Sequence, residues 1–129
     1  QESTRYCNYS QYRFGNRCTF CKPSTMDSWS EDKKKVFLKT LSIVDAAYQY
    51  LTSGDDSLVP QQARAVLANS LKTEIVVSGP AYEWKHFFDL RSHGTTGAPH
   101  PDMKFVADMA RRKVNKYINS LKYENRFRF

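Results

Sequence analysis

One long amphipathic helix constrains the fold of this 129-residue chain more than any other feature. Five apolar residues recur at helical spacing through its middle and predict a single buried stripe: Phe37, Leu41, Val44, Tyr48 and Leu51. Ser28 or Ser30 can cap the start of this helix, and Gly54 marks its stop. Glu31 and Asp32 suit the positive end of the helix dipole. The rest of the chain is therefore expected to cover this stripe.

Three shorter patterns predict further helices. One opens at Pro60 and runs to about Leu67. A second starts at Pro80, and its apolar side comprises Trp84, Phe87, Phe88 and Leu90. A third starts at Asp102, and its apolar stripe comprises Met103, Val106, Ala110, Val114, Tyr117 and Leu121.

Two segments predict a small antiparallel β portion. Aromatic and polar residues alternate over residues 5–20, and Gly15-Asn16 divides them into two short runs, as in a hairpin. Residues 73–77 are short and β-branched, which is typical of a strand. The predicted fold class is α+β: a single mostly helical domain over residues 1–129, with about four helices and a small antiparallel β portion.

The chain is basic, with 20 Lys and Arg against 13 Asp and Glu and a formal charge of +7. This balance suits an anionic partner such as nucleic acid, a nucleotide or a phosphorylated cofactor. The positive residues are dispersed, for example over 33–35 and 111–116, so a solvated face is the simpler explanation. A basic nucleic-acid-binding module stays open as an alternative, because four aromatic residues could stack on bases: Tyr6, Tyr9, Tyr12 and Phe14.

The three cysteines, Cys7, Cys18 and Cys21, all lie near the start of the chain. The spacing of Cys18 and Cys21 is that of half a zinc site or of a redox pair. Too few further ligands accompany them for zinc and no helix signal follows Cys21, so packing cysteines on a strand are favoured and no metal is expected. An odd cysteine count without a signal sequence predicts reduced thiols and a cytoplasmic protein. No apolar run is long enough to span a bilayer, so no membrane partner is expected.

Three segments, in order, resemble the landmarks of flavin-dependent thymidylate synthases. They are Ser3-Thr4-Arg5-Tyr6, then Ala63-Arg64-Ala65-Val66-Leu67, then residues 83–91, which read Glu-Trp-Lys-His-Phe-Phe-Asp-Leu-Arg. The third is similar to the family's Trp-x-His-Phe-x-x-Leu-Arg stretch, and residues 98–103 are similar to the segment that follows it. The resemblance covers about residues 1–121. It implies the C-terminal portion of such an enzyme, because the chain begins inside the family's signature motif and carries Gln1 where the family often has Glu.

The resemblance implies reductive methylation of dUMP to dTMP, with FAD as cofactor and methylenetetrahydrofolate and NADPH as co-substrates. The residues matching dUMP-binding positions are Gln1, Ser3, Arg5, Arg64 and Arg91. Arg91 also matches the catalytic arginine that polarises the uracil ring, since a fixed cation stabilises charge that develops there. The residues matching FAD-binding positions are Gln1, Pro80, Ala81, Tyr82 and His86.

The implied mechanism has no protein nucleophile, because the cofactor carries out the difficult step. Family members are homotetramers whose sites are shared between subunits, and the resemblance implies the same assembly here. It gives no reason to expect a nucleic-acid partner. A non-catalytic remnant that keeps the nucleotide pocket and an oligomer contact is a third possibility.

Overall fold

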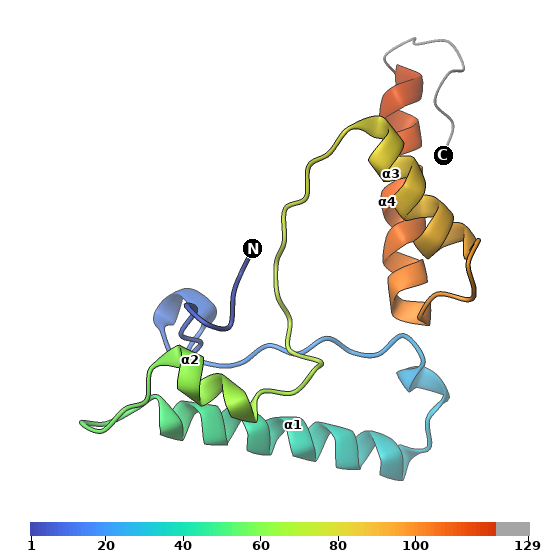
Figure 1. Cartoon of the computed structure of the whole chain (residues 1–129). Coiled ribbons are helices and arrows are strands. Elements are labelled where there is room, and N and C mark those ends of the chain that lie inside the picture. Colours follow the sequence, from blue (N-terminus) through green and yellow to red (C-terminus); the bar gives the residue numbers. More distant parts are fainter. Residues whose placement is uncertain (121–129) are drawn as a thin grey trace. The chain divides into compact units, whose positions relative to one another are not determined.

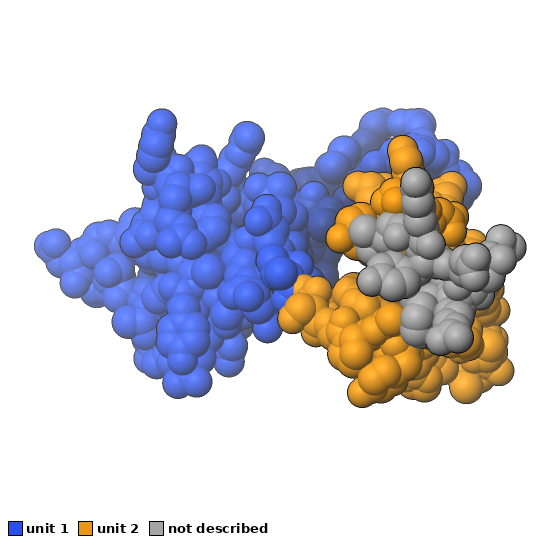
Figure 2. Space-filling view, turned by 90° about the horizontal axis from the view of Figure 1, so that it is seen from above, with its two compact units in different colours: residues 1–76 blue, residues 77–129 orange. Residues whose placement is uncertain are grey.

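A computed structural model describes residues 1–120 of the chain. The chain forms two compact units, the first spanning Gln1–Val76 and the second beginning at Val77 (Figures 1 and 2). The single domain over residues 1–129 stays a prediction. Among the described helices, none has the length and apolar character needed to cross a membrane.

The long helix of unit 1, α1 (Glu31–Leu51), confirms the predicted amphipathic helix. Ser30 is its cap, because the Ser30 hydroxyl accepts a hydrogen bond from the Lys33 N–H at 3.4 Å. Ser28 lies instead in a short 3₁₀ turn, η2 (Met26–Ser28). The predicted stripe faces inward: two of its side chains, Leu41 and Tyr48, are buried, and three are half-buried, Phe37, Val44 and Leu51.

The core of unit 1 forms where the N-terminal segment and two short helical turns cover α1 (Figure 1). These turns are α2 (Pro60–Ala63) and η3 (Arg64–Val66), which together confirm the predicted helix opening at Pro60. The buried residues at the centre are Tyr9, Cys18, Tyr48 and Ala63. The ring centroid of Tyr9 lies 5.7 Å from that of Tyr48, so the aromatic N-terminal segment is packed on the long helix.

The predicted antiparallel β portion is not formed: no strand occurs in residues 1–120. Residues Tyr12–Phe14 form a 3₁₀ turn, η1, and Gly15 and Asn16 after it have positive φ angles of 72° and 53°. Two of the alternating aromatics pack in a folded loop, where the ring of the buried Tyr9 lies 5.0 Å from that of Phe14, whereas Tyr6 and Tyr12 are exposed. One isolated antiparallel bridge occurs in the described chain, between Phe20 and Leu71, and it is not part of the predicted hairpin.

The predicted strand at residues 73–77 is likewise irregular in the structure. Its backbone is joined to the chain start by a hydrogen bond from the Glu2 N–H to the Glu74 carbonyl (2.7 Å), and no ladder extends along it within the described residues. Ile75 and Val76 are exposed. The β-branched residues 73–77 therefore have no neighbouring strand among the described residues. A segment with high strand propensity forms a sheet only when a second strand pairs with it.

Unit 2 contains α3 (Ala81–Phe88), a π-helical turn η4 (Asp89–His93) and α4 (Pro101–Ser120), which confirm the last two predicted helices. Phe88 is fully buried within an aromatic cluster that also contains Trp84 and Phe87. Helices α3 and α4 lie side by side in Figure 1 and contact each other.

The expected stripe of α4 is partly wrong. Three of its members, Met103, Val106 and Tyr117, are exposed, and the fully buried side chain is Ala107. The contact face of α4 is centred on this small residue because large neighbours, such as Phe88, occupy the interior of the unit. Leu121 lies outside the described residues.

Candidate functional site

The first landmark forms a turn fixed by both oxygens of Ser3. The Ser3 carbonyl accepts hydrogen bonds from the N–H groups of Tyr6 (3.0 Å) and Cys7 (2.9 Å). The Ser3 hydroxyl accepts one from the Arg5 N–H at 3.3 Å. The far end of the turn is anchored on α1, because the Tyr48 hydroxyl donates to the Cys7 carbonyl at 3.3 Å. Arg5 therefore projects from a backbone that is held to the core.

The side chain of Arg5, in the first landmark, contacts Gln61, which lies two positions before the second landmark. Its Nε donates to Oε1 of Gln61 on α2 at 3.4 Å, and its guanidinium lies 5.2 Å from the ring centroid of Tyr6. Arg64 begins η3 three positions after Gln61, so the two side chains leave the same face of one helical segment. Unit 1 thus contains Ser3 and Arg5, the predicted phosphate-binding residues, and Arg64, the further arginine predicted to bind dUMP.

Gln61 is a member of this site that sequence reasoning missed. The signal available for it was its place beside the second landmark, on the helical face of Arg64. In the structure Gln61 orients the Arg5 guanidinium, whose planar fork suits phosphate oxygens.

Gln1 stands at the exposed start of the same unit. Its neighbour Glu2 is held to Thr73 and Glu74 through the backbone: the Thr73 hydroxyl donates to the Glu2 carbonyl at 2.6 Å, and the Glu2 N–H donates to the Glu74 carbonyl at 2.7 Å. Nζ of Lys72 lies 3.8 Å from the Glu2 carboxylate. These contacts fix the chain between Gln1 and the Ser3 turn.

The other predicted cofactor residues gather at the start and on one face of α3 in unit 2. Pro80 is the N-cap of the helix and Ala81 its first residue. Tyr82 and His86 are both exposed and are one helical turn apart, so they share a face. This face ends near η4, which carries Arg91 with an exposed side chain.

A polar network fixes the π-helical turn that carries Arg91. The buried Ser92 hydroxyl donates to the Asp108 carboxylate. Lys104 Nζ donates to the Ser92 carbonyl at 2.8 Å and to Asp108 Oδ2 at 3.0 Å. The hydrogen bonds from Ser92 and Lys104 hold the pKa of Asp108 below its usual range. Turn η4 is thereby tied to α4, and π-helical turns of this kind are frequent at functional sites.

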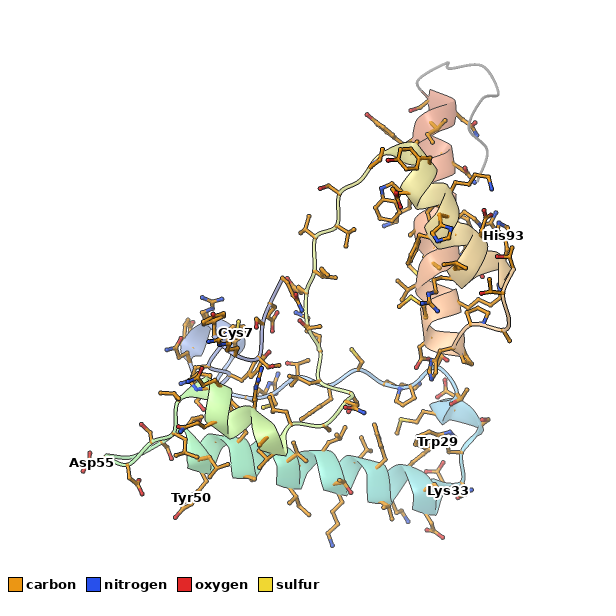
Figure 3. All side chains as sticks on the ribbon, viewed as in Figure 1. Cys7, Trp29, Lys33, Tyr50, Asp55 and His93 are labelled. Carbon is orange, nitrogen blue, oxygen red and sulfur yellow. The ribbon has the colours of Figure 1, made fainter. Side chains whose placement is uncertain are left out.

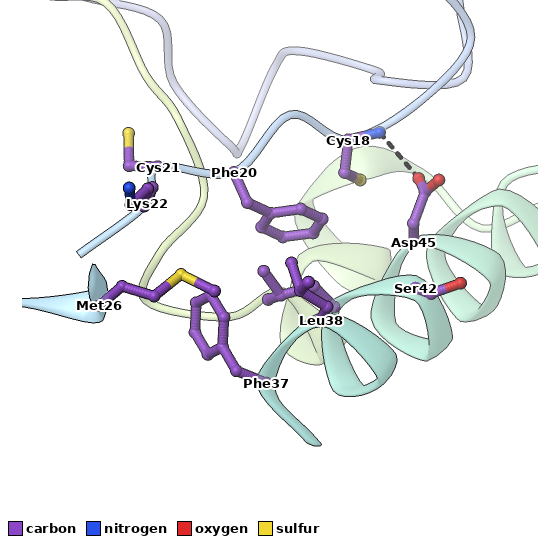
Figure 4. A pocket seen from close by; sticks show the side chains of 10 residues that line it. Cys18, Phe20, Cys21, Lys22, Met26, Phe37, Leu38, Ser42 and Asp45 are labelled. Atoms are coloured by element: carbon purple, nitrogen blue, oxygen red, sulfur yellow. Dashed lines mark hydrogen bonds between the residues drawn. The ribbon is translucent and has the colours of Figure 1, made fainter. Parts of the chain in front are cut away.

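A separate cavity of about 470 Å³ lies beside α1, lined by ten residues that Figure 4 draws. None of the predicted site residues lines it. The buried Cys18 stands at its edge, where its N–H donates to Asp45 Oδ1 at 2.8 Å. Burial and the neighbouring Asp45 carboxylate raise the pKa of the Cys18 thiol to about 12, so this thiol stays protonated at neutral pH and is a poor nucleophile.

The three cysteines are unpaired. Cys18 packs in the core, as expected for a structural cysteine, although it does so from a loop and not from a strand. Cys21 is exposed. In residues 1–120, no three side chains of His, Cys, Asp or Glu are grouped so that they could hold a metal ion.

Comparison with known proteins gives one family. The family model described as "Thymidylate synthase complementing protein" matches residues 1–118. No curated protein and no solved structure matches the chain. The family match spans all three landmarks. The chain therefore belongs to the thymidylate synthase complementing protein family, the flavin-dependent family of thymidylate synthases.

Proposed function

We propose that this chain supplies the dUMP-binding part of a flavin-dependent thymidylate synthase, which methylates dUMP to dTMP with methylenetetrahydrofolate and NADPH. The observation that carries the proposal is the contact between Arg5 and Gln61. It joins the first landmark to the helical segment that leads into the second, and in this proposal Arg5 and Arg64 act together on the nucleotide. The family match over residues 1–118 supports the same assignment.

In this proposal the phosphate of dUMP is bound by Ser3, Arg5 and Arg64. Arg5 and Arg64 each offer a planar set of N–H donors, which can form paired, charge-assisted hydrogen bonds with phosphate oxygens. Ser3 shapes the turn beneath Arg5 and its hydroxyl can donate to the same anion. Gln1, at the exposed end of this segment, would contact the nucleotide and the flavin.

The start of α3 fits a flavin cofactor. Pro80 has no N–H to donate, but the first helical turn presents the N–H groups of Ala81 and Tyr82 beside the positive end of the helix dipole, which suits a diphosphate. The Tyr82 ring is 67% exposed, so it is available to stack on a flat ring system, and His86 lies on the same face. When bound, reduced FAD would supply the hydride and take part in methylene transfer.

Arg91 is the proposed catalytic residue. Its exposed guanidinium would lie beside the uracil ring and stabilise negative charge that develops there. Ser92, Asp108 and Lys104 hold the backbone of η4 at the adjacent position, so the cation is presented from a rigid turn. No protein nucleophile is required, in keeping with the protonated state of the Cys18 thiol.

The proposed assembly is a homotetramer with sites shared between subunits, in which residues 1–129 act as one C-terminal portion of the enzyme. The proposed location is the cytoplasm, in keeping with three unpaired cysteines. The alternative of a nucleic-acid-binding module is less favoured, because the sheet it requires is not formed in residues 1–120 and Tyr9 is buried.

Calorimetric titration of dUMP into the chain, with and without FAD, tests the proposal. We expect binding that weakens by about 1.5–3 kcal/mol in Arg64→Ala, the usual contribution of a charged hydrogen bond. Arg112→Ala on α4 is the matched control, since it removes the same charge from an exposed position outside the predicted site. A folded chain that binds no dUMP under either condition would reject the nucleotide pocket. Binding without turnover when every co-substrate is supplied would favour the non-catalytic remnant.

A further inference from the structure

A small polar pocket in unit 1 is lined by none of the residues predicted to bind the nucleotide or the flavin. Its volume is about 190 Å³, which is below the range of roughly 300–1,000 Å³ typical of pockets for drug-sized ligands. The lining includes three cationic side chains, one carboxylate and one tyrosine: Arg13, Arg17, Lys72, Glu2 and Tyr9. In Figure 3 the labelled Cys7 marks the folded N-terminal segment from which most of these residues come. The size and the lining suit a small polar ion.

The Tyr9 hydroxyl is a buried donor that has no hydrogen bond. Tyr9 is 2% exposed, and within residues 1–120 no group accepts from or donates to its hydroxyl. Burial and the neighbouring Glu2 carboxylate raise the pKa of Tyr9, so the hydroxyl stays protonated at neutral pH and lies on the Glu2 side, toward the pocket. Buried polar groups of folded proteins are as a rule hydrogen-bonded to protein, water or an ion. The hydroxyl therefore has a hydrogen bond to give to a molecule in the pocket.

Two arginines of the lining supply further donors. Arg13 and Arg17 are exposed and take part in no ion pair within the described residues. The Arg13 guanidinium lies over the Phe14 ring, 4.6 Å from its centroid, and stacking of this kind leaves the N–H groups at its edge available. Guanidinium groups form strong, charge-assisted hydrogen bonds with oxyanions. The pocket therefore favours an oxyanion.

The carboxylate in the lining decides which oxyanion fits. The Glu2 side chain is 12% exposed, and Nζ of Lys72 lies 3.8 Å from it and offsets its charge. A carboxylate can only accept hydrogen bonds, so it repels an oxyanion without a proton and accepts from one that carries a proton. Inorganic phosphate keeps a P–OH group at neutral pH, whereas sulfate has none and a phosphate ester, with a second pKa of about 6, has largely lost it. Among these anions the lining favours inorganic phosphate.

We propose that this pocket binds inorganic phosphate, with Tyr9, Arg13 and Arg17 donating to its oxygens and Glu2 accepting from its P–OH group. Arg13 belongs to η1 and Glu2 precedes the Ser3 turn, so bound phosphate joins two segments of unit 1. It stabilises the folded chain, as a ligand that binds only the native state does. The site is separate from the nucleotide site proposed above and does not depend on it.

Calorimetric titration at about pH 8, where a phosphate ester is a dianion, tests the choice of anion. Inorganic phosphate should bind, and sulfate and ribose 5-phosphate should bind at least ~10-fold more weakly, because neither offers a proton to Glu2. Glu2→Gln should remove the preference over sulfate, since an amide also donates. A folded chain that binds no phosphate would overturn the site, and a preference that survives Glu2→Gln would overturn the role of Glu2. Equal affinity for ribose 5-phosphate would overturn the free ion as occupant and assign the pocket to the phosphate end of a larger molecule.

Arginine variants test where the phosphate binds. Arg17→Ala should weaken phosphate binding at least ~10-fold, the usual effect of losing a charge-assisted hydrogen bond. Arg64→Ala is the matched control, because it removes the same side chain from an exposed position of the same unit and does not line the pocket. Phosphate binding that is lost in Arg64→Ala and kept in Arg17→Ala would place the anion at the proposed nucleotide site and overturn this one.

Tyr9→Phe separates the role of the hydroxyl from the packing of the ring. Without phosphate its melting temperature should not fall, because the hydroxyl has no hydrogen bond to lose and the ring keeps its contacts with Phe14 and Tyr48. Phosphate should raise the melting temperature of the wild type more than that of the variant, each measured against an equal concentration of sulfate, which stabilises proteins by exclusion from their surface. A variant that melts lower without phosphate would show that the hydroxyl already has a partner. That result, or an equal rise in both proteins, would overturn the role of Tyr9 in the site.

Discussion

Tyr48 connects the core of unit 1 to the turn that presents Arg5, so a change of one atom there tests the link between fold and site. Its side chain is fully buried, and its hydroxyl donates to the Cys7 carbonyl at 3.3 Å. Tyr48→Phe keeps the ring and its edge contact with Tyr9 but leaves that carbonyl without its donor. A neutral hydrogen bond contributes about 0.5–1.5 kcal/mol net, and this one is long, so we expect a loss of about 1 kcal/mol.

Urea unfolding followed by tryptophan fluorescence measures this loss. In a Trp84→Phe background, Trp29 is the remaining tryptophan and reports on α1, because its ring centroid lies 5.6 Å from that of Phe37. With a urea dependence of about 1–3 kcal/mol/M, the midpoint should fall by about 0.3–1 M at unchanged slope. Tyr12→Phe is the control, since Tyr12 is 89% exposed, and its midpoint should not move. Equal midpoints for the two variants would refute the anchoring role of Tyr48.

Three further predictions concern unit 2. Ser92 and Lys104 lower the folded-state pKa of Asp108, so its carboxylate stabilises the unit at pH values above the ordinary aspartate pKa, and this stabilisation is lost as the pH falls through the lowered pKa. Acid unfolding, followed by Trp84 fluorescence in a Trp29→Phe background, should therefore depend less on pH in Asp108→Asn. Identical acid unfolding profiles for the two proteins would count against the network. Gly94→Ala should destabilise the unit by at least about 1–2 kcal/mol, because Gly94 has φ +70° and an added Cβ would lie 3.0 Å from the Gly97 carbonyl oxygen and from Pro99 Cδ. Thermal unfolding measures this loss, and Gly79→Ala is the control because its added Cβ meets only ordinary contacts. Equal melting temperatures for the two variants would disprove the steric argument. Arg91→Ala should abolish thymidylate synthesis in an active protein containing this chain while leaving its melting temperature unchanged, since Arg91 is exposed, and normal turnover would reject its catalytic role.

Sequence reasoning succeeded where the signal is local. The stripe of α1 and the helices opened by Pro60 and Pro80 follow from spacing and end signals that depend on neighbouring residues, whereas the choice of Ser30 over Ser28 as the cap of α1 did not. It failed for residues 5–20, where alternating aromatics suggested a hairpin. Tyr9 and Phe14 pack together above Tyr48 from a loop, and periodicity does not distinguish a buried loop from a half-buried strand.

The same limit applies to the site. The landmark residues Ser3, Arg5 and Arg64 could be named from their motifs, but Gln61 could not, because its contact with Arg5 joins positions that only folding brings together. The Ser92, Lys104 and Asp108 network was missed for the same reason, since it links a turn to the middle of the next helix.

The sequence by itself determined that a long helix with one buried stripe organises the chain, and it indicated the family through three ordered motifs. Both are properties of residue identity and spacing along the chain. Only the tertiary structure decided that the aromatic N-terminal segment is a packed loop, that Arg5 meets Gln61, and that α1 keeps an uncovered apolar face at Val36, Ile43 and Tyr50. Which side chains are buried and which contact each other depends on how distant segments pack in the folded chain, and spacing along the sequence does not contain that information.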